Sequence, residues 1–87
     1  MPVRITKQRM TTLKRRKVDL DQALHIGITR IVDHPDSASA AYSYGRTLQL
    51  AGRRKEAFDQ FARAYDIDRA SSRYRRAYFA ARAALGN

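Results

Sequence analysis

Apolar residues recur at steps of three and four along most of this chain, which is the spacing of amphipathic helices. The first stripe starts after Asp19 and comprises Leu20, Ala23, Leu24, Gly27, Ile28 and Ile31. His34-Pro35 ends it, because the residue before a proline is pushed out of the helical region. The pattern therefore predicts a first helix from about Asp19 to His34, with these six residues on its buried side.

A second helix is expected up to about Ala51, with Asp36 or Ser37 as its N-terminal cap. Gly52 follows it and supplies the turn, since glycine adopts a left-handed C-terminal cap without steric cost. The residues expected on its buried side are Ala41, Tyr44, Gly45 and Leu48. Gly45 is small enough to let a neighbouring helix approach closely.

A third helix is predicted from about Arg54 to Ile67, and a fourth begins at a cap offered by Ser71 or Ser72 and stops at Gly86. Their buried sides are expected to carry Ala57, Phe58, Phe61, Ala64 and Tyr65 in the third helix and Tyr74, Ala77, Tyr78, Ala81 and Leu85 in the fourth. Because the connections are short and polar, the fold class predicted is all-α, with about four antiparallel helices.

Residues 1–17 show no clean hydrophobic period. They hold seven basic side chains and no acidic one, so we interpret them as a basic N-terminal arm, flexible or partly helical. The same composition is found in organellar transit peptides, which is the less favoured interpretation. The predicted organisation is therefore an arm at 1–17 and a helical domain at 18–87.

The helical domain contains an internal echo with a period of 34 residues. Gln22-Ala23-Leu24 returns as Glu56-Ala57-Phe58, Ile31 as Tyr65, and Pro35 as Arg69. Helix-pair repeats of this length stack on their neighbours to bury their apolar faces, and the stack displays a concave surface. The echo therefore points to binding rather than catalysis.

Residues 38–71 resemble one complete tetratricopeptide repeat. Gly45 stands at the small residue of the family's first helix, Gly52 at the turn between helices, and Phe61 at the aromatic position of the second helix. The remaining matches are Tyr44, Leu48, Glu56, Ala57, Ala64, Ile67 and Asp68. The resemblance implies stacked antiparallel helical hairpins.

The flanking segments resemble half-units and depart from the family pattern. In residues 19–35, Gly27 replaces the aromatic residue and Arg30 the small one. In residues 72–86, the 34-residue spacing puts Phe79 where a small residue belongs, and a register shifted by one, with Tyr74 and Tyr78, fits better. The array holds fewer than the three or so units that such stacks need. We therefore expect a homodimer or a place in a larger assembly.

In this family the concave face of the first helices commonly binds extended peptides or a partner helix. The positions of this chain that correspond to that face are Ser39, Tyr42, Arg46, Gln49, Arg73 and Arg76. Arginines around an exposed tyrosine suit a carboxylate-bearing ligand, such as an acidic segment of a partner protein. The alternative is an ordinary solvated face, because charged residues are mostly exposed. Tyr42, Tyr74 and Phe79 are further candidates for an exposed aromatic cluster at an interface.

The net charge of +10 is concentrated at the two ends of the chain. Residues 18–68 hold six basic and eight acidic side chains, whereas residues 69–87 hold five arginines and no acid. This distribution favours an anionic partner, with Lys14-Arg15-Arg16-Lys17 as the densest run. A nucleic-acid-associated protein is therefore the alternative function. Its phosphate contacts would come from the arm and from Arg73, Arg75, Arg76 and Arg82.

Catalytic chemistry finds little support in this sequence. Cysteine is absent, and His25 and His34 lack the helical spacing of a metal-binding pair. The acidic i,i+2 pairs point to different faces of a helix, so they do not form an acid/base dyad. We therefore expect a non-enzyme without a metal or cofactor. No apolar run approaches the length of a membrane span, which favours a cytoplasmic protein.

Overall fold

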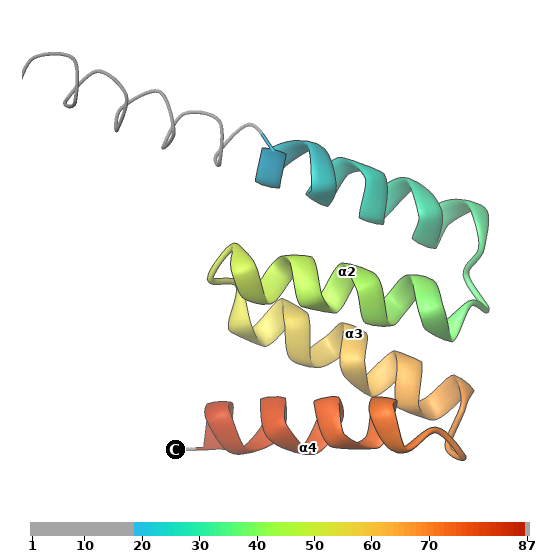
Figure 1. Ribbon diagram of the computed structural model, residues 1–87, viewed down its shortest axis with the longest axis vertical. Coiled ribbons are helices and arrows are strands. Elements are labelled where there is room, and N and C mark those ends of the chain that lie inside the picture. The colour runs from blue at the N-terminus through green and yellow to red at the C-terminus, as the bar shows by residue number, and fades with distance from the viewer. Residues whose placement is uncertain (1–18, 87) are drawn as a thin grey trace, which may run out of the picture.

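The computed structural model describes residues 19–86, and these form four helical segments without a strand. The segments are residues 19–33, α2 (Ala38–Leu50), α3 (Arg54–Ile67) and α4 (Ser72–Gly86). Consecutive helices run antiparallel and lie side by side in chain order, as Figure 1 shows. The all-α fold class predicted from the sequence is confirmed. The predicted basic arm, residues 1–17, lies outside the described residues.

Ser37, Ser71 and Gly52 form the caps and the turn that the sequence predicted at the helix ends. The Ser37 hydroxyl accepts a hydrogen bond of 3.1 Å from the Ala40 N–H, and the Ser71 hydroxyl accepts one of 3.3 Å from the Tyr74 N–H. Each bond satisfies a backbone donor that has no partner within the first turn of its helix. Gly52, between α2 and α3, has a φ of +79°, a conformation that glycine adopts without strain.

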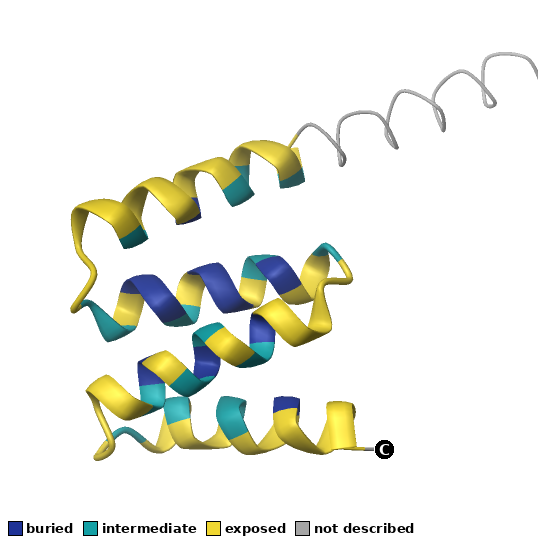
Figure 2. Ribbon diagram, turned by 180° about the vertical axis from the view of Figure 1, so that it is seen from behind, coloured by how far each residue is buried: buried dark blue, intermediate teal, exposed yellow. Residues whose placement is uncertain are grey.

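The core lies mainly between α2 and α3, where the buried residues, dark blue in Figure 2, are concentrated. Leu48 and Phe61 are its largest fully buried side chains. Around them the buried hydrophobic residues are Ala40, Ala41, Tyr44, Ala57, Ala64 and Ala81. The many alanines among them allow the facing helices to pack closely. Most of these buried residues belong to the apolar stripes predicted from the sequence.

The prediction that Ile28 and Leu85 lie in the core is wrong. Ile28 is 48% exposed and Leu85 is 41% exposed. Ile28 follows the buried Gly27 by one residue, which turns it about 100° around the helix and away from α2. Leu85 lies in the last turn of α4, and no later helix covers it within residues 19–86.

Two tyrosines that are 34 residues apart, Tyr44 and Tyr78, make equivalent contacts in the structure. Tyr44 packs over Gly27 so closely that a Cβ atom on this glycine would lie 2.5 Å from Tyr44 Cδ1. Tyr78, which follows Tyr44 by 34 residues, stacks on Phe58 and Tyr65 with ring centroids 5.4 Å apart in both pairs. Both tyrosines thus contact the helix that precedes their own. The covered residues of α4 are nevertheless those of the shifted register, because Tyr74, Ala77, Tyr78 and Ala81 are buried or half-buried while Phe79 and Arg82 are exposed.

Candidate functional site

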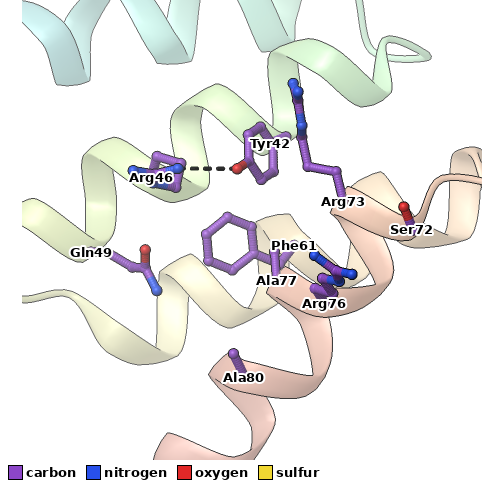
Figure 3. A pocket seen from close by; sticks show the side chains of 9 residues that line it. All are labelled: Tyr42, Arg46, Gln49, Phe61, Ser72, Arg73, Arg76, Ala77 and Ala80. Carbon is purple, nitrogen blue, oxygen red and sulfur yellow. Dashed lines mark hydrogen bonds between the residues drawn. The ribbon is translucent and has the colours of Figure 1, made fainter.

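An open groove with a volume of about 580 Å³ lies between α2 and α4, and Figure 3 shows it from close by. Its lining residues are Tyr42, Arg46, Gln49, Phe61, Ser72, Arg73, Arg76, Ala77 and Ala80. They include every predicted concave-face residue except Ser39, which is exposed in the first turn of α2. The structure therefore brings the positively charged residues of two separate helices to one site.

The floor of the groove is aromatic. The Tyr42 ring lies 5.8 Å from the Phe61 ring and 5.3 Å from the Tyr74 ring, measured between centroids. Phe61 is fully buried and supports Tyr42 from α3, so Tyr42 is half-buried rather than exposed as the sequence suggested. Such tilted aromatic pairs are favourable contacts, and they give the groove a fixed apolar surface.

Arg46 is oriented over this floor by Tyr42, one turn earlier on α2. Arg46 Nη1 donates a hydrogen bond of 3.0 Å to the Tyr42 hydroxyl, drawn as a dashed line in Figure 3. The guanidinium carbon also lies 5.9 Å from the centre of the Tyr42 ring. A guanidinium has five N–H donors, so this arrangement leaves several of them for a ligand.

Arg73 and Arg76 face the groove from α4, where they are exposed and three residues apart. The lining thus contains three guanidinium groups and no carboxylate. The ion pairs found among residues 19–86 lie elsewhere and join Arg53 to Glu56 and Arg69 to Asp66. The groove therefore has a positive potential that suits a carboxylate or phosphate group.

A second groove, of about 540 Å³, lies between α3 and α4 and has mixed charge. Its arginines already have partners. Arg69 donates a hydrogen bond of 2.9 Å to Asp66, which raises the pKa of Arg69 above its ordinary value, and Arg63 donates one of 2.7 Å to the Pro35 carbonyl. Asp59 adds a further carboxylate to the lining. This groove is consequently a poorer site for an anion than the groove between α2 and α4.

The three candidate interface aromatics do not form one cluster. Tyr42, at the floor of the first groove, pairs with Tyr74, whereas Phe79 lies 5.1 Å from Tyr78 and 6.2 Å from Tyr65 by ring centroids. Phe79 is 49% exposed. These aromatics therefore belong to two different surfaces of the helix stack.

Some groove residues were not identified from the sequence. Phe61 was assigned only to the core, although it also forms part of the groove floor. Ala77 and Ala80 follow Arg73 and Arg76 by four residues, and this helical spacing could have placed them beside the arginines. The predicted basic run Lys14-Arg15-Arg16-Lys17 lies outside the described residues.

Within the described part of the chain, no group of three or more His, Asp or Glu side chains is placed to hold a metal ion. None of the helices described is both long and apolar enough to cross a membrane. Comparisons with protein-family models, with curated proteins and with solved structures found no match for this chain.

Proposed function

We propose that this chain is a non-catalytic protein-interaction module of tetratricopeptide type that binds an acidic segment of a partner protein. The observation that carries the proposal is the groove between α2 and α4, where Arg46, Arg73 and Arg76 surround an aromatic floor without a lining carboxylate. Acidic side chains of the ligand would accept hydrogen bonds from the guanidinium groups. An apolar residue beside them would pack on Tyr42.

The groove favours a short segment over a whole domain surface. Its volume of about 580 Å³ is within the usual range of ligand sites, and it is open along its length between two helices. Hydrogen bonds to charged groups contribute about 1.5–3 kcal/mol each when shielded, and less here because the arginines are exposed to solvent. We therefore expect moderate affinity that weakens as salt concentration rises. A cytoplasmic location, expected from the composition, is part of this proposal.

The test is fluorescence anisotropy with a labelled peptide that alternates glutamate and leucine. Arg46→Glu and Arg73→Glu should each weaken binding about tenfold or more, because each places a carboxylate where the ligand's own carboxylates bind. Lys55→Glu is the matched control, since it makes the same charge change at an exposed position of α3 outside the groove. A peptide that alternates glutamine and leucine tests whether the ligand's negative charge is needed, and it should bind more weakly than the glutamate-leucine peptide. Equal binding by wild type and both groove variants would show that the groove is not the site.

A second candidate function is association with nucleic acid. Its supporting observation is that α4 exposes Arg73, Arg75, Arg76 and Arg82, while residues 69–87 contain no acidic side chain. Clustered arginines contact phosphates readily and give affinity that is independent of sequence. The run Lys14-Arg15-Arg16-Lys17 would add to this affinity. The groove between α2 and α4 favours the first function, because its arginines surround an apolar floor that suits a peptide side chain.

A further inference from the structure

One side of α4 carries an exposed aromatic ring between two arginines. Phe79 is 49% exposed, and Arg75 and Arg82 lie one turn before it and one turn after it on the same side of the helix. Both arginines are exposed, and neither takes part in the ion pairs found among residues 19–86. We call these three residues the outer face of α4.

The outer face of α4 is separate from the groove between α2 and α4. At about 100° per residue around a helix, the groove residues Ala77 and Ala80 lie about 160° and 100° from Phe79. Phe79, Arg75 and Arg82 line neither this groove nor the one between α3 and α4. A ligand on the outer face therefore leaves the first groove accessible.

Phe79 is supported by two tyrosines on its covered side. Its ring centroid lies 5.1 Å from that of Tyr78 and 6.2 Å from that of Tyr65, and the ring planes are tilted by 60° and 56°. Neither tyrosine therefore lies flat against Phe79, and about half of the side chain stays open to solvent. A side chain that neighbours already hold in place loses little conformational freedom when a ligand packs on it.

The charge around the outer face favours an anion. All the charged side chains of α4 are arginines, and residues 69–87 contain no acidic side chain. Carboxylates beside this surface come from α3, where Asp59 and Asp66 line the second groove together with Tyr78, and Asp66 is already paired with Arg69. An anionic ligand would therefore run along α4 and avoid α3.

The chemistry of the outer face suits a single strand of nucleic acid. A base stacks on an aromatic ring without needing a cavity, and arginines bind the phosphates of the strand. The bases of a duplex stack on one another, whereas an unpaired base can stack on a side chain. A protein partner fits less well, because the core of a protein interface is depleted in charge, and here a single apolar side chain lies between two charged ones.

We propose that the outer face of α4 binds a single strand of nucleic acid, with one base stacked on Phe79 and neighbouring phosphates bound by Arg75 and Arg82. The proposal rests on the second candidate function, association with nucleic acid, and adds the form of the strand and the residue that contacts a base. Stacking on Phe79 makes the affinity depend on bases, which arginines alone do not provide. Because the two surfaces are separate, one molecule can hold a strand on the outer face and an acidic peptide in the first groove.

The test measures binding of two labelled probes to the full chain by fluorescence anisotropy. Oligouridine has phosphates and bases, whereas heparin is anionic and has no bases. Phe79→Ala should weaken oligouridine binding at least about fivefold, the loss expected when one stacked base loses its platform, and should leave heparin binding unchanged. Phe79→Tyr is the matched variant. It keeps the ring and should bind both probes as the wild type does.

The contribution of the arginines is tested through salt dependence. Arg75→Gln combined with Arg82→Gln should make the slope of log oligouridine affinity against log salt concentration shallower by about 1.4, which is about 0.7 per phosphate contact. The charge-matched control combines Arg54→Gln with Lys55→Gln, at exposed positions of α3 outside the outer face. It should leave the slope nearly unchanged. Because the substituted side chains are exposed, the helical circular dichroism of every variant should match that of the wild type.

The outcomes separate this proposal from the function on which it rests. A wild type that does not bind oligouridine would overturn both. If the wild type binds oligouridine and Phe79→Ala binds it equally well, stacking on Phe79 is wrong, while association through charge remains. A loss of the same size for oligouridine and heparin in Phe79→Ala would likewise overturn the stacking contact, because heparin has no base to stack.

Discussion

The ring of Phe61 occupies the space that a side chain at Gly45 would need. A Cβ atom on Gly45 would lie 2.6 Å from Phe61 Cε1 and 2.8 Å from Cδ1, both well inside van der Waals contact. The absence of a side chain at this position allows α3 to approach α2 closely and buries Phe61 almost completely. The same ring then supports Tyr42 at the floor of the groove, so one contact serves both the core and the candidate site.

Gly45→Leu should therefore destabilise the fold. The added side chain must displace the Phe61 ring, and overpacking of this kind costs about 1–3 kcal/mol, which exceeds the gain of about 1 kcal/mol in helix propensity at most such sites. Urea unfolding followed by far-UV circular dichroism measures the change. Gly86→Leu is the control, because no atom lies within 4 Å of a Cβ built there. Equal stability of both variants would contradict the packing of Phe61 on Gly45.

Leu48→Ala should lower the free energy of unfolding more than Leu50→Ala does. Leu48 is fully buried in the core, so its loss removes apolar contacts and leaves a cavity, at a cost of about 2–5 kcal/mol. Leu50 is 79% exposed, and Leu50→Ala should stay within about 0.5 kcal/mol of the wild type. The midpoint of urea unfolding distinguishes the two. If both variants unfold at the same midpoint, α2 presents a different face to α3.

The capping role of Ser37 gives a third prediction. Ser37→Ala removes the side-chain oxygen that accepts from the Ala40 N–H, which should lower the free energy of unfolding by about 1 kcal/mol. Ser39→Ala is the matched control two residues later, at an exposed helical position where alanine has the higher helix propensity. The thermal midpoint should therefore fall for the first variant and stay equal or rise for the second. A fall of the same size in both would argue against the cap.

Local signals in the sequence were sufficient to predict the helices and the residues at which they begin and end. Ser37, Gly52 and Ser71 act within one turn of their own position, so the bonds that they make depend little on the rest of the fold. The close approach of a neighbouring helix at Gly45 was predicted from the small size of glycine, although the sequence did not show that Phe61 would fill the space. The helix boundaries and the central core could therefore be predicted from the sequence alone.

The end helices were harder to predict for a physical reason. A helical stripe shows which side of a helix is apolar, but its burial depends on how many neighbours cover that side. Ile28 and Leu85 belong to such stripes, yet each lies on a helix with one described neighbour, and both are exposed. The groove residues were predicted from the resemblance to a tetratricopeptide repeat, whereas the half-buried state of Tyr42 depends on contacts with two other helices.

The second candidate function predicts a specific change in salt dependence. Replacing Lys14, Arg15, Arg16 and Lys17 by glutamine in the full chain removes four charges that could each neutralise a phosphate. For single-stranded RNA, the slope of log affinity against log salt concentration is about 0.7 per phosphate contact. The slope should therefore become shallower by up to about 3. Anisotropy of a labelled oligouridine across a salt series measures it.

A matched control separates this effect from the loss of net charge. Replacing Arg53, Arg54 and Lys55 by glutamine removes a basic run of similar density at the start of α3, on the helix that does not belong to the arginine-rich end of the chain. If phosphates are bound by Lys14-Arg15-Arg16-Lys17, this control should leave the slope nearly unchanged while the first variant reduces it. Equal reductions in both would mean that RNA responds only to overall charge. Such a result would favour the proposed binding of an acidic segment in the groove between α2 and α4, which is lined by Arg46, Arg73 and Arg76.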